Sequence, residues 1–254
     1  MNWLEVLAYI ALGLFAGTYG TLVGVGGGLF LVPALIFFAH LPPKEAAGTS
    51  MAVVLANAAS GSFSYLRQRR VALRTGVVFA AAGLPGALLG GYIDQLLPRA
   101  VLGLLLGIFL LILALRLLLQ KPQPGSPADV HAAHTSQWSA VLIAVGAGFI
   151  ASMFGVGGGI MYVPLMLYVL RYAPHIATAT STFTIALTAL LGTASHAYFG
   201  DIHYAAAAML AVGAIAGAQI GVLLSTRIQA APLVRLFAAA VLASALWLIY
   251  RAVH

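Results

Sequence analysis

The stretch Gly24-Val25-Gly26-Gly27-Gly28, followed by Val32-Pro33, is the most informative part of this chain, because it occurs twice. Gly155-Val156-Gly157-Gly158-Gly159 is followed by Val163-Pro164 at the same spacing. Residue numbers 24 and 155 differ by 131, and many other positions agree at that offset without a gap. The matching pairs are Pro43 with Pro174, Ala46 with Ala177, Thr49-Ser50 with Thr180-Ser181, Gly61 with Gly192, Gly86-Ala87 with Gly217-Ala218, and Gly90 with Gly221. The chain therefore holds two copies of one unit.

Composition places both copies in a membrane. Of the 254 residues 62% are apolar and only 7% are charged, and the mean hydropathy is +1.04. A soluble globular protein carries roughly 25% charged residues. Cysteine is absent, which excludes disulfides and thiolate chemistry. The net charge of +7 then indicates basic cytoplasmic loops rather than nucleic-acid binding.

The apolar segments repeat in the same order within each copy. The first copy predicts a helix over 3–23, the glycine break, a short apolar arm over 29–40, and spans over 44–66, 71–93 and 99–119. The second predicts 138–154, the break, 160–170, and spans over 174–197, 202–224 and 232–252. Residues 120–137, polar and rich in proline, form a cytoplasmic linker. We therefore expect one membrane domain, with repeats at 1–119 and 138–254.

Charge placement predicts that the two copies face opposite ways. One loop of the first copy is strongly basic, whereas its equivalent in the second copy has no Lys or Arg. These loops hold Arg67, Arg69, Arg70 and Arg74 in the first copy, and His196, Asp201 and His203 in the second. Basic loops stay in the cytoplasm. The predicted fold is an all-α integral membrane protein with two inverted-topology repeats, about eight transmembrane elements, and a broken, glycine-rich hairpin as the first element of each repeat.

The glycine breaks are the predicted binding site. A glycine in a helix costs roughly 0.5–1 kcal/mol relative to alanine, so several together should end the helix. Main-chain N–H groups freed inside a membrane must face protein or a polar cavity, and at a helix N-terminus they favour an anion. The candidate residues are Gly24, Gly26, Gly27, Gly28, Gly155, Gly157, Gly158 and Gly159. Close helix packing is the structural alternative, and a dinucleotide loop would need a preceding strand.

Polar side chains near the breaks extend this candidate site. Thr49 and Ser50, with Thr180 and Ser181, offer hydroxyl donors at matching positions. Asn57 and Gln219 are further candidates for lining a cavity. Serine and threonine also bond to helical carbonyls or cap helix ends, which is the alternative interpretation.

The sequence offers little for other kinds of site. No Asp or Glu lies at the centre of a predicted span, which argues against a cation site built from carboxylates. His196 and Asp201 could shuttle protons or be ordinary loop residues. His131 and His134, three residues apart, could bind a metal or be ordinary residues of the solvated linker. No metal site, cofactor or catalytic residue is predicted, and the chain is not expected to be an enzyme.

The doubled Gly-x-Gly-Gly-Gly segment with a following proline, the Ala-x-x-Thr-Ser helix and the Gly-Ala-x-x-Gly helix resemble the TauE/SafE family of membrane permeases, the sulfite exporter family. The resemblance covers nearly the whole chain outside the linker. It implies a multi-pass protein of the prokaryotic inner (plasma) membrane that exports small sulfur-containing anions without ATP. It assigns binding to the two breaks and to Thr49, Ser50, Thr180 and Ser181.

These observations predict a secondary transporter for sulfite or organosulfonates that works by alternating access near the middle of the bilayer. Its expected partners are the anion and the lipid bilayer, with proton coupling or the membrane potential as the driving force and no nucleic acid. The anion, the coupling ion and the oligomeric state are left open. A passive anion channel of the same fold and a non-transporting membrane scaffold are the alternatives.

Overall fold

The computed structural model describes residues 3–119, 137–170 and 172–225, together with positions 242, 245, 246, 249 and 250. Within these residues the structure is helical and has no strand. Nearly all of the expected linker, with His131 and His134, and most of the last expected span at 232–252 lie outside the described residues. The described residues therefore cover the first copy and most of the second copy as far as residue 225.

The helices follow the predicted order in both copies. In the first copy they are α1 (Trp3–Val23), α2 (Gly28–Phe37), α3 (Pro43–Arg67), α4 (Leu73–Leu96) and α5 (Arg99–Leu119). In the second copy they are α6 (Gln137–Phe154), α7 (Gly159–Pro164), the π-helix η1 (Leu165–Val169), α8 (Pro174–Phe199) and α9 (Tyr204–Leu224). Pro43 and Pro174 begin α3 and α8, where a missing N–H costs no helical bond. The π-helix was not predicted; it directly follows Pro164, which lacks the N–H of a regular helical bond.

Length and polarity suit a membrane. Four described helices, α1, α4, α8 and α9, are long and apolar enough to cross a bilayer. Large apolar side chains face outward on several helices, among them Leu88, Leu89, Ile108, Val212, Ile215 and Leu223. Polar side chains lie inside instead, including Thr49, Ser50, Asn57, Thr180, Ser181 and Thr188. Apolar groups outside and hydrogen-bonded polar groups inside are the arrangement that lipid requires.

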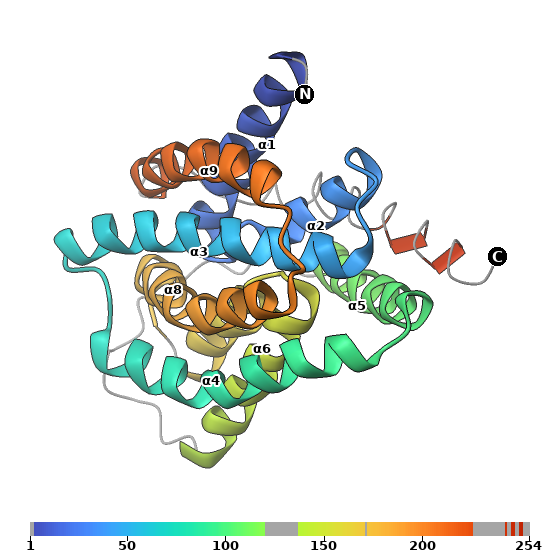
Figure 1. Cartoon of the computed structure of the whole chain (residues 1–254). Helices are drawn as coiled ribbons and strands as arrows, with labels where there is room; N and C mark the ends of the chain where they lie inside the picture. Colours follow the sequence, from blue (N-terminus) through green and yellow to red (C-terminus); the bar gives the residue numbers. More distant parts are fainter. Residues whose placement is uncertain are drawn as a thin grey trace.

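Helices α3 and α8 form the centre of the molecule (Figure 1). α1 packs with α9 and contacts α3, while α6 packs with α4 and contacts α8. α3 and α8 run in opposite directions, because the loop after each helix is bonded to the start of the other. The N–H of His203, after α8, donates to Thr49 Oγ1 at 2.9 Å, and the N–H of Ala72, after α3, donates to Thr180 Oγ1 at 3.0 Å.

The outer helix pairs approach closely at the Gly-Ala-x-x-Gly motifs. A Cβ atom added to Gly86 of α4 would lie 2.0 Å from the carbonyl oxygen of Val145 in α6. A Cβ atom added to Gly217 of α9 would lie 2.3 Å from the carbonyl oxygen of Leu14 in α1. All four residues obey the offset of 131. The motif therefore serves helix packing in both copies, as small residues do in membrane proteins.

Candidate functional site

Both glycine segments break the helix, as predicted. In the first break Gly24, Gly26 and Gly27 have φ values of 79°, 85° and 85°, and in the second Gly155, Gly157 and Gly158 have 66°, 88° and 65°. Side chains other than glycine rarely adopt this left-handed region. Gly27 and Gly158 are the N-caps of α2 and α7. Each break therefore ends one helix and starts another within five residues.

The two breaks lie against each other inside the protein. A Cβ atom on Gly28 would lie 2.4 Å from the carbonyl oxygen of Gly155, and one on Gly159 would lie 2.3 Å from that of Gly24. Every residue of 24–28 and 155–159 is buried. We call this contact between residues 24–28 and 155–159 the crossing. It brings the N-terminal ends of α2 and α7 to one place.

Two serine hydroxyls hold the crossing together. Ser50 Oγ in α3 donates to the carbonyl oxygen of Gly155 at 2.7 Å. Ser181 Oγ in α8 donates to the carbonyl oxygen of Gly24, also at 2.7 Å. Each copy therefore satisfies a carbonyl in the break of the other copy. The two serines act on the backbone of the breaks in this structure, and their hydroxyl hydrogens are already used.

Several main-chain N–H groups at the crossing have no acceptor among the described residues. In the first copy they belong to Gly27, Gly28 and Leu29, and in the second to Gly157 and Gly158. Two other N–H groups of the first break are bonded, since Val25 and Gly26 both donate to the Gly20 carbonyl, at 2.8 and 3.1 Å. The free N–H groups cluster where α2 begins, which is the positive end of that helix.

Two apolar side chains and one polar side chain lie next to the turn at Gly26 in the crossing. A Cβ atom on Gly26 would lie 3.1 Å from Val54 Cγ1 and 3.3 Å from Ile185 Cγ2. Both of these fully buried side chains therefore pack closely against the glycine turn. Asn57 is buried as well; its Nδ2 donates to the Gly26 carbonyl at 3.2 Å, and its Oδ1 accepts from Thr21 Oγ1 at 3.2 Å. Asn57 therefore supports the first break.

Gln219 is not brought to the crossing. It is exposed on α9, where its Nε2 donates to the Ser60 hydroxyl at 2.7 Å and its Oε1 accepts from Ser64 Oγ at 2.5 Å. It ties α9 to α3 from the outside. Thr49 and Thr180 are fully buried beside Ser50 and Ser181, and accept the N–H bonds from the two loops described above.

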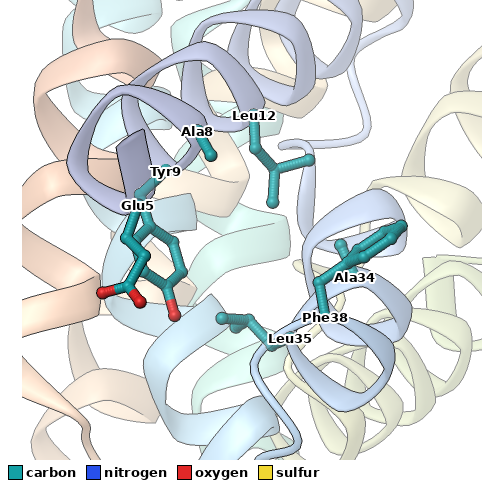
Figure 2. A pocket seen from close by; sticks show the side chains of 7 residues that line it. All are labelled: Glu5, Ala8, Tyr9, Leu12, Ala34, Leu35 and Phe38. Atoms are coloured by element: carbon teal, nitrogen blue, oxygen red, sulfur yellow. The ribbon is translucent and has the colours of Figure 1, made fainter. Parts of the chain in front are cut away.

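A pocket of about 360 Å³ lies elsewhere, between the start of α1 and the end of α2 (Figure 2). The lining residues are Glu5, Ala8, Tyr9 and Leu12 of α1, Ala34 and Leu35 of α2, and Phe38 directly after α2. Its lining is mostly apolar, and its one formal charge is the negative Glu5. Tyr9 has the one side-chain donor among these lining residues, and the Glu5 carboxylate disfavours a negative charge, so the pocket does not suit a small anion.

A second polar group lies at one end of the helix bundle. It consists of Asp94 of α4, His196 of α8 and Asp201 of the following loop. Each residue has one carboxylate oxygen or ring nitrogen in the group, and these three atoms lie within 4.8 Å of one another. Asp94 and His196 are fully buried. From the sequence, His196 and Asp201 were considered only as possible proton carriers. Asp94 was not predicted to belong to a site, because no local pattern links it to residues about a hundred positions away. The offset of 131 was the available clue, since it pairs His196 with Tyr65 and Asp201 with Arg70.

Comparison with known proteins identifies the family. The sequence model described as "Sulfite exporter TauE/SafE" matches residues 9–248. The chain belongs to the TauE/SafE family. The chain is 30% identical over 265 residues to the probable membrane transporter protein YunE of Bacillus subtilis, covering 96% of this chain and 97% of that protein.

Two more TauE/SafE relatives extend the comparison. A probable membrane transporter protein of Xylella fastidiosa is 31% identical over 236 residues, covering 91% of this chain and 89% of that protein. One from Methanocaldococcus jannaschii is 26% identical over 235 residues, covering 87% and 86%. No solved structure matches the chain. The family and these relatives are described as exporters or transporters rather than enzymes, so this is a multi-pass protein of a membrane transporter family.

Proposed function

We propose that this protein is a secondary transporter that exports small sulfur-containing anions, sulfite or organosulfonates, across the prokaryotic inner membrane by alternating access. The observation that carries the proposal is the crossing, where the N-terminal end of α2 and a second helix start meet and leave main-chain N–H groups without acceptors. Helix N-termini buried at such a meeting point bind anionic substrates in transporters built from repeats. The family description supplies the sulfur oxyanion.

The proposal includes an inverted-repeat architecture of eight membrane elements. Each bent hairpin, α1 with α2 and α6 with α7 and η1, counts as one element, and three spans follow it in each copy. The antiparallel course of α3 and α8 supports the inversion, as do the reciprocal bonds from Ser50 and Ser181. The basic loop at 67–74 then faces the cytoplasm.

An oxyanion would be bound without any cationic side chain. The N–H groups of Gly27, Gly28 and Leu29 are neutral donors at the positive end of a ten-residue helix. The hydroxyls of Thr49 and Thr180 accept N–H bonds here and keep their own hydrogens available. Neutral donors bind an anion weakly enough to release it on the other side, which a carrier requires.

Transport requires the crossing to open. Val54 and Ile185 lie against the glycine turns and leave no space for an oxyanion beside Gly26, so this arrangement corresponds to a closed state of the carrier. Rocking of one copy against the other would move Val54 and Ile185 apart from the turns, toward one side of the membrane or the other. The membrane potential, negative inside, drives an anion outward, and proton coupling would add to it.

The test uses purified full-length protein and proteoliposomes. Sulfite, sulfonates, sulfate and carboxylates are compared for thermal stabilisation and for flux. Sulfite or a sulfonate is expected to stabilise the protein most and to show saturable flux. The double variant Thr49→Val/Thr180→Val should bind the anion about thirtyfold more weakly, since each of the two lost hydrogen bonds contributes about 1 kcal/mol. The matched Thr49→Ser/Thr180→Ser variant keeps both hydroxyls and should behave like the wild type.

The alternatives make different predictions in the same experiment. A passive channel would give flux that rises with concentration without saturating. A scaffold would give no flux with any anion of the panel. Unchanged anion affinity in the valine double variant would remove Thr49 and Thr180 from the site.

A further inference from the structure

We infer that Asp94, His196 and Asp201 form a binding site for a divalent first-row transition-metal cation, such as Zn²⁺ or Mn²⁺, at the end of the bundle opposite the basic loop 67–74. This inference does not depend on the transported anion, because the occupancy of the site can be measured without transport. The three residues come from α4, α8 and the loop between α8 and α9.

The hydrogen bond of His196 defines which ring nitrogen is available. Nε2 lies 2.9 Å from the carbonyl oxygen of Ser152. A carbonyl only accepts hydrogen bonds, so Nε2 carries the hydrogen and donates. In the neutral imidazole Nδ1 then presents a lone pair, and it faces Asp201 Oδ2 at 3.5 Å. Two acceptors facing each other in a buried place require a positive charge between them.

The spacing fits a metal better than a proton. A hydrogen bond from a protonated imidazole to a carboxylate would be about 2.7–2.9 Å long. Two ligand atoms bound tetrahedrally to one Zn²⁺ lie about 3.4 Å apart, given metal–ligand distances of about 2.1 Å. The observed 3.5 Å between Nδ1 and Oδ2 matches the second case, and Nδ1 has no hydrogen-bond partner among the described residues. All three ligand atoms lie within 4.8 Å of one another, so the side chains would close around the ion on binding.

Asp94 supplies the independent observation that a ligand is needed. Its side chain is fully buried, and Oδ1 has no hydrogen-bond partner in the described part of the chain. Lys44 is the nearby cation, but its Nζ donates to the main-chain oxygen of Gln95 at 3.2 Å, at the negative end of α4. The Lys44 charge therefore interacts with the carboxyl-terminal end of α4. A divalent cation would balance the charges of the Asp94 and Asp201 carboxylates.

The surroundings of the three ligands resemble those of known metal sites. A ligating histidine normally donates its second N–H to a carbonyl or carboxylate, and ligating carboxylates are themselves hydrogen-bonded. Here Ser152 provides the carbonyl. The Gln95 amide donates to the Asp201 carboxylate and, at 3.5 Å, to Asp94 Oδ2. The Asp201 side chain is 13% exposed, which gives a cation a route from the aqueous face.

The other copy offers the ideal substitution for the test. Tyr65, the equivalent of His196, donates to the Thr21 carbonyl at 3.0 Å, as His196 does to that of Ser152. His196→Tyr should therefore keep the structural hydrogen bond and remove the metal ligand. Asp94→Asn keeps the shape and removes one charge. His175→Ala is the matched control, because His175 is exposed at the far end of the same helix.

The experiment uses full-length protein with its purification tag removed and metals stripped by a chelator. Thermal unfolding and titration calorimetry are followed with Zn²⁺, Mn²⁺ and, for comparison, Mg²⁺. We expect Zn²⁺ or Mn²⁺ to stabilise the wild type and His175→Ala equally. His196→Tyr and Asp94→Asn should bind at least about 100-fold more weakly, since losing even an outer-shell partner costs roughly 10–100-fold. Gln95→Met removes such a partner and should have a smaller effect.

Two results would overturn the inference. One is a wild-type protein that gains no stability from either metal at millimolar concentration, including the case in which lowering the pH alone stabilises it through His196. The other is a metal effect of equal size in the wild type, His196→Tyr and Asp94→Asn. If His196→Tyr fails to fold, Asp94→Asn alone decides the outcome.

Discussion

The two ends of the helix bundle share one framework and carry opposite charge. At the end next to the α3–α4 loop, Arg70 donates to Ser225 Oγ at 3.0 Å and lies 5.0 Å from the centre of the Tyr65 ring. At the other end the residues at the offset of 131 are Asp201, Asp94 and His196. At the first end the positive charge comes from the Arg70 side chain. At the other end two carboxylates and one histidine lie together, and the inference above places a metal cation among them.

The shared part of this comparison lies in backbone contacts. Tyr65 and His196 each bond a carbonyl in the last turn of α1 or α6, where helical partners are missing. Ser50 and Ser181 bond the breaks, and Thr49 and Thr180 bond the loops. The repeat thus preserves what holds the crossing in place, while the charged side chains at the two ends differ. Each of the following predictions tests one part of that equivalence.

The largest effect is expected at the crossing. Gly28→Val and Gly159→Val each place a Cβ within 2.4 Å of a carbonyl oxygen of the opposite break, so both should lose transport and destabilise the protein by about 3 kcal/mol or more. Thermal unfolding and flux in proteoliposomes measure this. Gly146→Ala is the control, because nothing lies within 4 Å of its added Cβ. If only one of the two valine variants is damaged, the breaks are not equivalent.

The second largest effect is expected from the loss of the hydrogen bonds that Ser50 and Ser181 donate to the breaks. Ser50→Ala and Ser181→Ala each leave a buried carbonyl without its donor, so each should lower the free energy of unfolding by about 1–3 kcal/mol. Denaturant or thermal unfolding of the two single variants and the double variant measures the loss. Ser60→Ala, at a half-buried position, removes hydrogen bonds to Ile215 and Gln219 on the outer face of α3 and should cost no more than about 1 kcal/mol. A loss confined to one serine would contradict the reciprocal arrangement.

The helix-end bonds allow a direct exchange between the copies. Tyr65→Phe removes the bond to the Thr21 carbonyl and should cost about 1 kcal/mol. His196→Tyr keeps the corresponding bond, and without metal it should unfold close to the wild-type temperature. Unfolding in the presence of a chelator compares the two. Equal destabilisation would show that tyrosine at position 196 does not reach the Ser152 carbonyl.

The smallest effect is expected at Gln219. Its equivalent in the first copy is Leu88, which is exposed. Gln219→Leu makes the copies alike and removes bonds on the outer face of α3 and α9, so stability should change by no more than about 1 kcal/mol and anion affinity should stay the same. Titration of the anion measures the second point. A clear loss of anion affinity in Gln219→Leu would show that Gln219 contributes to the binding site.

Much of the helical framework could be predicted from the repeat. The helix expected over 3–23 is observed as Trp3–Val23, and the break at Gly24 to Gly28 has the left-handed geometry that glycine permits. Apolar runs of membrane length and proline at helix starts are local features, so the sequence reports them. The π-helix η1 was missed, because the widening after Pro164 depends on how the short arm packs.

The contacts within the site depend on distant residues and were harder to predict. Ser50 was expected to offer its hydroxyl to an anion, whereas it donates to Gly155, 105 positions away. Asp94 lies one residue beyond the span expected over 71–93, and its position beside His196 follows only from the packing of α4 with α8. Gln219 lay on a motif helix, but its place on that helix faces outward.

The bond from Ser181 to Gly24 also has a consequence for biosynthesis. The two residues are 157 positions apart, and a ribosome working at roughly 5–20 residues per second needs about 8–30 s to make that length of chain. During this interval the newly inserted first copy has an open backbone carbonyl inside the bilayer. We therefore expect the nascent chain to stay beside the insertion machinery until residue 181 arrives.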